Sequence, residues 1–198
     1  KVRELYPQNY KNLNRIEKGV VHRVDTAVLL FEDECSLSNT ATIGYQWSKK
    51  GVQPQILCKQ KKRERQTLFG SYNYESGQIT ASFADKGNSY TFKKHLKKVL
   101  WTYREAPEII MVLDNVAYHH AKRIAVWLMK NPKLSFVFLP PYSPDLNAIE
   151  RAWWYMRKKI THNRYLKSLK DRKAEFWKMF SHFHKPNTEL KQVCEINY

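Results

Sequence analysis

Hydrophobic and polar positions are grouped in short blocks in the centre of the chain. A continuous apolar run at Ile109–Leu113 is typical of a strand buried on both faces, and Phe136–Leu139 repeats the pattern. Between these runs, apolar residues recur at helical spacing over Tyr118–Leu128. The order strand, helix, strand predicts an α/β unit.

A proline-rich loop and a further helix follow the second run. The sequence PPYSP at residues 140–144 cannot continue a strand, because proline lacks the N–H that a sheet requires. The next helix is expected to be capped by Asp145 or Asn147 and to run past Trp153.

The N-terminal half is predicted to hold mainly strands. The first core strand is expected at Thr26–Phe31, followed at its end by the acids Glu32, Asp33 and Glu34. A second strand or hairpin is expected at Gly44–Ser48, continuing to residue 58, and alternating residues predict a hairpin over residues 65–84. Residues 90–103 carry apolar side chains on one face and predict an amphipathic helix.

These elements predict one α/β domain with a mixed central sheet flanked by helices. Residues 1–25 are interpreted as a lead-in segment, residues 26–165 as the domain, and residues 166–198 as a basic helical tail that packs on it. No apolar run approaches the roughly 20 residues of a membrane span, so no membrane partner is expected. The packing residues expected in the tail are Phe176, Trp177, Phe180 and Phe183.

The charge of the chain points to a polyanionic partner. Thirty-five Lys and Arg against eighteen Asp and Glu give a net charge of +17. Basic clusters interleaved with aromatic residues favour nucleic acid over a membrane surface, although each cluster could instead be a solvated helix face. The residues predicted to contact DNA are Lys61, Lys62, Arg63, Arg157, Lys158 and Lys159.

The cysteines indicate a reducing compartment. Cys35, Cys58 and Cys194 are widely spaced and odd in number, and they match neither a zinc site nor a disulfide framework. Reduced thiols of a cytosolic or nuclear protein are therefore expected.

Three acids stand at positions where elements meet. Asp33 and Asp114 follow predicted strands, and Glu150 lies in the first turn of a predicted helix. Carboxylates converging from separate elements require cations, and hard oxygen ligands favour Mg²⁺ or Mn²⁺. Two such ions could activate a water and stabilise the leaving oxygen of a phosphodiester.

Simpler interpretations of these acids remain open at the level of the sequence. Asp114 with Asn115 could form a turn, and Asp33 with Glu34 could be surface acids. Glu150 lies three residues after Asn147, so the pair could form a capping box.

Four motifs together resemble the catalytic domain of mariner-like insertion-sequence transposases of the DDE superfamily. They are FEDECSL, GYQW, VLDNVAYHHA and LPPYSPDLNAIERAWWYMRKKI, and the resemblance covers about residues 27–164. It implies an RNase H-like fold and two Mg²⁺ or Mn²⁺ ions per active site. By this resemblance the catalytic, metal-binding acids are Asp33, Asp114 and Glu150, with Glu34, Asn115 and His119 in supporting roles.

The resemblance also implies an activity and partners. The expected function is metal-dependent phosphodiester hydrolysis and strand transfer at transposon ends, by a homodimer or larger assembly bound to transposon-end and target DNA. The expected location is cytoplasmic and DNA-associated, at the nucleoid, or in the nucleus of a eukaryote. The alternatives are a related RNase H-like nuclease, such as a resolvase or RNA–DNA hybrid hydrolase, and a non-catalytic transposon-derived DNA-binding protein.

One expected part is missing from the pattern. Members of this family generally carry an N-terminal helix-turn-helix region that recognises the element ends, and no such pattern is recognisable in this sequence. Because the first residue is lysine, the chain is expected to be a fragment or processed product of a longer protein.

Overall fold

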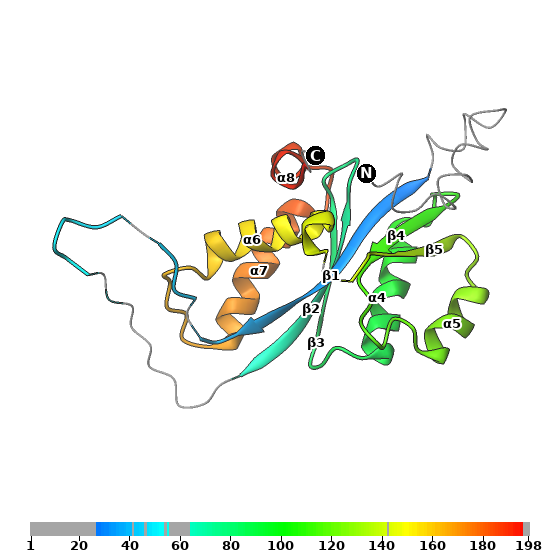
Figure 1. Cartoon of the computed structure of the whole chain (residues 1–198), viewed down its shortest axis with the longest axis horizontal. Helices are drawn as coiled ribbons and strands as arrows, with labels where there is room; N and C mark the ends of the chain where they lie inside the picture. The colour runs from blue at the N-terminus through cyan, green and yellow to red at the C-terminus, as the bar shows by residue number, and fades with distance from the viewer. Residues whose placement is uncertain are drawn as a thin grey trace.

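A mixed five-stranded sheet forms the centre of the protein, in the order β3-β2-β1-β4-β5 (Figure 1). The computed structural model describes residues 27–195 except 41, 46, 54, 56–63 and 142. The expectations for residues 1–25 and for Lys61, Lys62 and Arg63 therefore lie outside the described residues.

The sheet combines a parallel and an antiparallel half. Strand β1 (Val28–Ser38) pairs in parallel with β4 (Ile109–Leu113), which pairs in parallel with β5 (Leu134–Phe138). On its other side β1 pairs antiparallel with β2 (Arg65–Asn73), and β2 forms a hairpin with β3 (Ile79–Ala84). The predicted mixed sheet and the hairpin at residues 65–84 are confirmed.

Strand β1 is longer than the sequence suggested. It continues to Ser38, so Glu32, Asp33 and Glu34 lie within the strand and not at its end. The reason is the partner on each side: β4 pairs with β1 only as far as Phe31, whereas β2 pairs with it through Ser38. The acids thus lie where the parallel half of the sheet stops, which opens a crevice at the carboxyl end of β4.

Helices cover both faces of the sheet (Figure 1). On one face lie α6 (Ala148–Ile160), α7 (Leu169–Phe183) and α8 (Thr188–Cys194). The other face carries α4 (Ser89–Thr102) and α5 (Lys122–Met129). Within the described residues, no helix is both long and apolar enough to cross a membrane.

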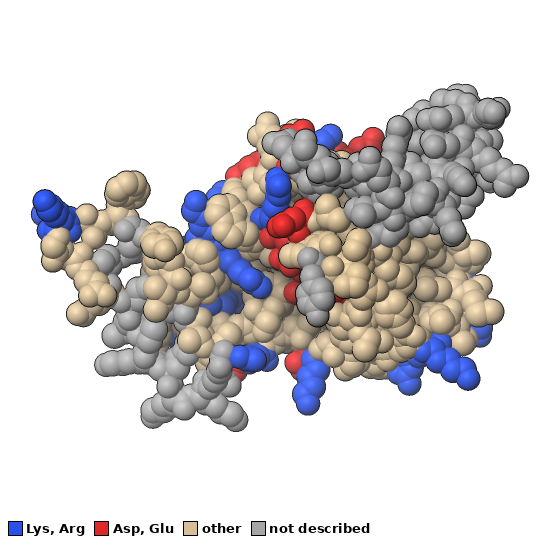
Figure 2. Space-filling view, viewed as in Figure 1, with Lys and Arg blue, Asp and Glu red and all other residues tan. Residues whose placement is uncertain are grey.

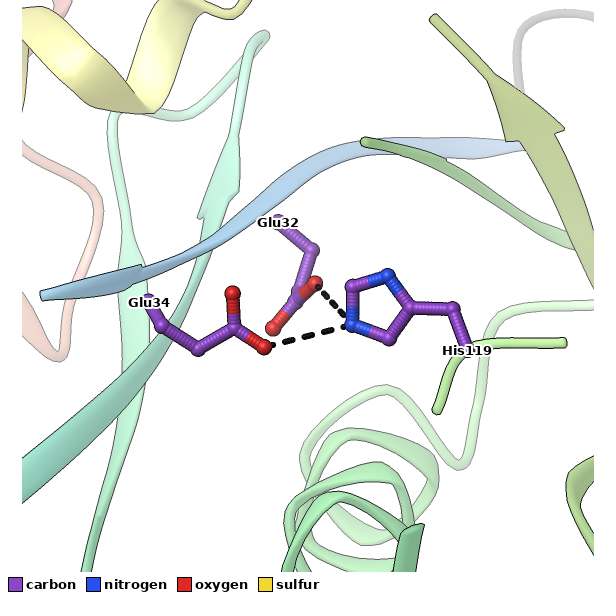
Figure 3. Close-up of side chains that lie close together, drawn as sticks. All are labelled: Glu32, Glu34 and His119. Carbon is purple, nitrogen blue, oxygen red and sulfur yellow. Dashed lines mark hydrogen bonds and ion pairs between the residues drawn. The ribbon is translucent and has the colours of Figure 1, made fainter. Parts of the chain in front are cut away.

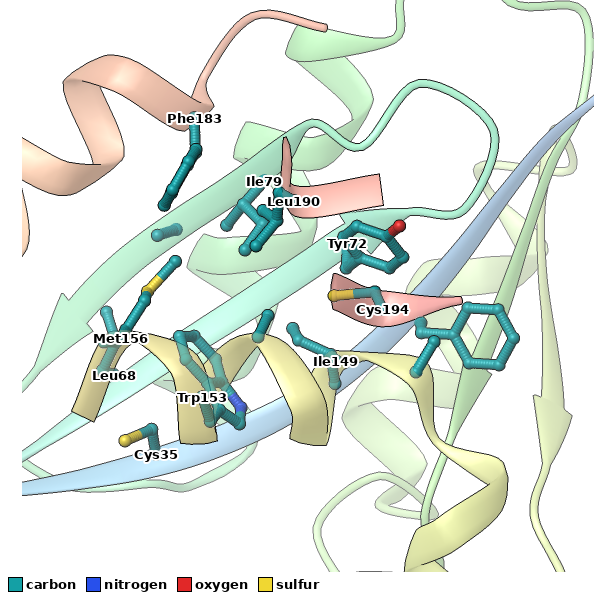
Figure 4. Packing of buried hydrophobic residues seen from close by; sticks show 14 of the residues in the cluster. Cys35, Leu68, Tyr72, Ile79, Ile149, Trp153, Met156, Phe183, Leu190 and Cys194 are labelled. Atoms are coloured by element: carbon teal, nitrogen blue, oxygen red, sulfur yellow. The ribbon is translucent and has the colours of Figure 1, made fainter. Parts of the chain in front are cut away.

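In the core beneath α6, the large side chain of Trp153 packs directly on Gly70. Trp153 is 1% exposed and packs on β2 (Figure 4). A Cβ atom placed on Gly70 of β2 would lie 2.4 Å from the indole of Trp153, so only glycine leaves room for the ring here. This close approach holds α6 against the sheet at the level of Asp33, because Gly70 is the partner of Asp33 across the strand pair.

The segment between β1 and β2 differs from its prediction. No strand forms over Gly44–Ser48 among the described residues, and residues 56–58 lie outside them. Thr42 instead makes an isolated bridge with His162, and the Gly44 N–H donates to the side chain of Asn163. This segment is therefore attached to the end of α6 and not to the sheet.

Two helix predictions also need correction. Helix α5 begins at Lys122, four residues after Tyr118, because the preceding residues form a turn in which the His119 N–H donates to the Val116 carbonyl. The tail forms two helices, and Trp177 is 44% exposed, lying against Phe83 at the surface. The tail residues Phe176, Phe180 and Phe183 are buried, as expected.

Candidate active site

Asp33, Asp114 and Glu150 line one pocket together with Asn115 and the loop at residues 139–147. They come from β1, from the residue after β4, and from the first turn of α6. Acidic side chains gather near the centre of the face seen in Figure 2, beside Lys and Arg side chains. The sequence motifs therefore identified residues that the fold brings to one place.

Asp33 and Asp114 of this pocket and the neighbouring Glu34 are close enough to share a cation. Oxygen atoms of Asp33, Glu34 and Asp114 all lie within 4.8 Å of one another. Burial, with the negative charges of Glu150 and Glu34, raises the pKa of Asp33 to about 8. Burial disfavours the charged form of Asp33 and the neighbouring carboxylates add to this effect, so a bound cation would lower the pKa of Asp33 again. The donor set consists of hard oxygens and fits a divalent ion of the Mg²⁺ type.

His119 lies between these acids and contacts them with both ring nitrogens. Its Nδ1 is 3.3 Å from Oδ1 of Asp114, and its Nε2 is 3.2 Å from Oε1 of Glu34. Burial alone would lower the pKa of His119, but its hydrogen bonds to Asp114 and Glu34 raise the pKa to about 10. The same bond to His119 lowers the pKa of Asp114. His119 thus joins the end of β4 to the middle of β1.

Glu32 is a member of this cluster that the sequence motifs did not identify. Its side chain is fully buried, both oxygens lack a hydrogen-bond partner among the described residues, and Oε2 is 3.7 Å from Nε2 of His119. Figure 3 shows Glu32 and Glu34 pointing toward the same imidazole ring. Burial, followed by the charge of Glu34, raises the pKa of Glu32 well above its usual range. The available signal was strand alternation, which places Glu32 and Glu34 on the face opposite Asp33.

Two asparagines position the loops around the pocket. The side-chain amide of Asn115 donates to the main-chain carbonyl of Leu139, which ties the loop after β4 to the loop after β5. The main-chain N–H of Asn147 donates to Pro144, and its side chain makes no capping bond to α6. The capping-box interpretation of Glu150 is therefore excluded, and Glu150 is exposed and faces the pocket.

The basic residues predicted on α6 have different surroundings. The guanidinium of Arg157 donates to Sγ of Cys35, 3.0 Å away, and the side chain is half-buried. Lys159 forms an ion pair of 3.0 Å with Glu189. Lys158 is exposed, and its ammonium lies 4.8 Å from the centre of the Trp154 ring.

The fold and the position of the acids define the class of the protein as RNase H-like. The chain superposes on the Mos1 mariner paired-end complex with Mn with a TM-score of 0.65 at 14% identity, covering 93% of this chain and 55% of that chain. It also matches the Mos1 transposase catalytic domain with Raltegravir and Mn, with a TM-score of 0.55 at 14% identity, covering 94% and 90% of the two chains. The RNase H-like prediction is confirmed.

The family follows from the sequence comparison. The model of the DDE superfamily endonucleases matches residues 28–173, and the chain belongs to this family. It is 29% identical over 141 residues to the 39 kDa protein of insertion element IS630 from Shigella sonnei, which covers 71% of this chain but only 41% of that protein. It is 24% identical over 104 residues to protein y4pE/y4sA of Sinorhizobium fredii (strain NBRC 101917 / NGR234), covering 52% and 74% of the two chains.

Proposed function

We propose that this chain is the catalytic domain of a DNA transposase that hydrolyses phosphodiester bonds at transposon ends and transfers the cut strand to target DNA. The observation that carries the proposal is the convergence of Asp33, Asp114 and Glu150 in one pocket. Membership of the DDE superfamily endonucleases and the similarity to the IS630 protein support the same conclusion.

Asp33, Asp114 and Glu150 are the residues that would hold two Mg²⁺ or Mn²⁺ ions. When bound, these ions lower the pKa of an attacking water and stabilise the negative charge on the leaving oxygen. The feature of the chain that supports this proposal is the setting of Asp33, whose pKa is raised by burial and by the nearby negative charges of Glu150 and Glu34.

The remaining groups of the cluster hold these acids in place. His119 fixes the orientation of Asp114 through its Nδ1, and its other nitrogen is held by Glu34. The Tyr118 hydroxyl also donates to Glu34, on the same oxygen, Oε1, that His119 contacts. We therefore assign Glu34 and His119 to positioning, and Asn115 to holding the loop that lines the pocket.

The partner is double-stranded DNA, both as transposon end and as target. The net charge of +17 suits a polyanion, and Lys158 is an exposed cation on α6, the helix that carries Glu150. The matched Mos1 structures include paired-end complexes. By analogy, we infer that this chain acts as a homodimer or larger assembly that brings two DNA ends together, at the nucleoid or in a nucleus.

We further propose that residues 166–198 belong to the same domain as residues 26–165, and that residues 1–25 form a lead-in segment before it.

The test is DNA cleavage with Mg²⁺ on plasmid and on DNA carrying the element ends. Asp33→Asn, Asp114→Asn and Glu150→Gln should each lower the cleavage rate by at least about a hundredfold, the upper range for residues that merely support metal ligands. Glu105→Gln is the matched control, because Glu105 is an exposed acid whose ion pair among the described residues is with Arg104. A joined donor–target product would separate a transposase from a resolvase or hybrid hydrolase. Normal cutting by all three variants would contradict the proposal.

A further inference from the structure

Trp154 presents its indole to solvent on the same face of α6 as Glu150. The two residues are four positions apart, which places them about 6 Å apart along the helix axis and on neighbouring turns. Trp154 is 56% exposed, whereas its neighbour Trp153 is buried in the core over Gly70. The core therefore contains one of the two adjacent tryptophans, and the other is exposed one helical turn beyond Glu150.

A cation accompanies this indole. The ammonium of Lys158, one further turn along α6, lies 4.8 Å from the centre of the Trp154 ring. Glu150, Trp154 and Lys158 thus form a line along the exposed face of the helix, with a carboxylate at the pocket, an aromatic plane next to it, and a positive charge beyond. In the described part of the chain, the indole N–H of Trp154 makes no hydrogen bond.

We propose that Trp154 and Lys158 form a binding site for an unpaired nucleotide of the DNA strand that enters the acidic pocket. The indole would stack on the base, and the ammonium would contact a phosphate of the same strand. This inference rests on the proposed function; it adds Trp154 as a contact residue and an unpaired nucleotide as the class of ligand. A base exposes its face for stacking only where it is unpaired and out of the helical stack, so a fully paired duplex does not satisfy this site.

The chemistry of the patch favours a nucleic-acid strand over a protein partner. Lysine is depleted at the centres of protein–protein interfaces, yet here Lys158 lies directly over the ring. Proteins that bind single strands without sequence preference generally combine an aromatic ring, on which a base stacks, with a nearby cation. We therefore expect this contact to be tolerant of sequence and to favour DNA that is unpaired next to the bond to be cut.

The test uses two probes that carry 2-aminopurine, namely a single strand about 12 nucleotides long and the same strand in a paired duplex. Binding is measured by fluorescence with Ca²⁺ replacing Mg²⁺, so that the result does not depend on cleavage. Trp154→Ala should weaken binding of the single strand about tenfold and that of the duplex by no more than about twofold. It should also reduce quenching of the probe, whereas Trp154→Phe should retain most of both effects.

Trp101→Ala is the matched control. Trp101 is 70% exposed with the guanidinium of Arg104 over its ring at 4.9 Å, so it repeats the chemistry of the proposed site. It lies on α4, which covers the opposite face of the sheet from α6. Its substitution should change the binding of neither probe.

Lys158→Gln should weaken the binding of both probes and reduce the dependence of binding on salt, since it removes a phosphate contact.

The outcomes separate this inference from the proposed function. The Trp154 proposal is overturned if Trp154→Ala binds the single strand as tightly as the wild type does. It is overturned as well if Trp101→Ala loses as much affinity for the single strand as Trp154→Ala. It is also overturned if Trp154→Ala alters only the sedimentation of the DNA-free protein, which would make this face a contact between copies. A wild-type protein that shows the expected binding but cuts no DNA with Mg²⁺ would count against the proposed function alone.

Discussion

The side-chain amide of Asn147 donates a 3.0 Å hydrogen bond to the main-chain carbonyl of Glu32. Both residues are buried, and the bond joins the residue before α6 to the residue before Asp33 in β1. The side chain of Asn147 binds the strand and does not cap its own helix, so this bond sets where α6 begins relative to the sheet. Asp33 follows Glu32 directly and Glu150 lies three residues after Asn147, so the bond also sets the distance between these two acids.

Removal of this bond should affect cleavage more than folding. We expect Asn147→Ala to lower the free energy of unfolding by about 1–3 kcal/mol, since the carbonyl of Glu32 loses its buried donor. Cleavage should fall by about a hundredfold, because a shift of one of the acids by about 1 Å suffices for that loss. Urea unfolding and Mg²⁺-dependent cleavage measure the two effects.

The control for this variant is Asn131→Ala, which removes a side-chain hydrogen bond of 2.7 Å to the Trp127 carbonyl far from the acids. It should cost stability without a specific loss of cleavage. If both variants lose cleavage only in proportion to the protein that unfolds, Asn147 has no positioning role.

Divalent ions should bind between Asp33 and Asp114. In crystals soaked with Mn²⁺, we expect density there with carboxylate distances of about 2.1 Å, which is the range of small hard cations. The apparent affinity should rise with pH up to about 8, because Asp33 must lose its proton before it can serve as a ligand. Titration of Mn²⁺ by electron paramagnetic resonance measures this affinity. Equal affinity in Asp33→Asn would contradict the assignment.

Gly70 should not tolerate a side chain. An alanine Cβ at this position would lie 2.4 and 2.5 Å from atoms of the buried Trp153 ring and 3.0 Å from Ile149. We expect Gly70→Ala to lower the free energy of unfolding by about 1–3 kcal/mol through overpacking, and to reduce cleavage because α6 carries Glu150. Denaturant unfolding measures the first effect. Gly87→Ala is the comparison, as its nearest contact is 3.2 Å away at the Tyr118 hydroxyl, and an equal loss there would contradict this explanation.

His95 should make the protein less stable in acid. Its ring is fully buried between the hydroxyls of Ser71 and Ser82, each 2.9 Å away, and burial with the nearby charge of Lys98 lowers its pKa to about 3. The unfolded chain binds a proton at this residue below about pH 6.5, whereas the folded chain does not. Stability should therefore fall as the pH drops from about 6.5 toward 3, by up to about 1.4 kcal/mol per pH unit from this group.

The measurement is the urea midpoint of wild type and His95→Gln at several pH values. The difference between the two proteins isolates the contribution of His95 from that of the carboxylates. The same slope in both proteins over this range would show that His95 is not buried in its neutral form.

Short, strongly patterned segments could be predicted from the sequence, and longer-range relations could not. The buried run at Ile109–Leu113 was assigned correctly because a strand covered on both faces is apolar throughout. The end of β1 was not, because its acids break the apolar pattern while β2 continues to pair with it through Ser38. A local pattern of hydrophobic and polar residues does not indicate which strands will pair.

The candidate site shows the same division. Asp33, Asp114 and Glu150 were identified from local motifs, and the fold places them in one pocket. The local sequence shows Glu32 only as one of three neighbouring acids, because its contact with His119 joins residues far apart in the chain. For Asn147 local spacing predicts a helix cap, whereas its side chain binds a carbonyl of β1 that the local sequence does not show.

The order in which the chain supplies its acids has a consequence for the cell that makes it. Synthesis begins at the N-terminus, so a nascent chain that ends before α6 carries Asp33 and Asp114 but lacks Glu150. The same nascent chain lacks Trp153, which closes the core over Gly70. Products that end before Glu150 would therefore hold no complete site. Under the proposed function, the genome of the host is exposed to cutting only by molecules whose α6 is complete and folded.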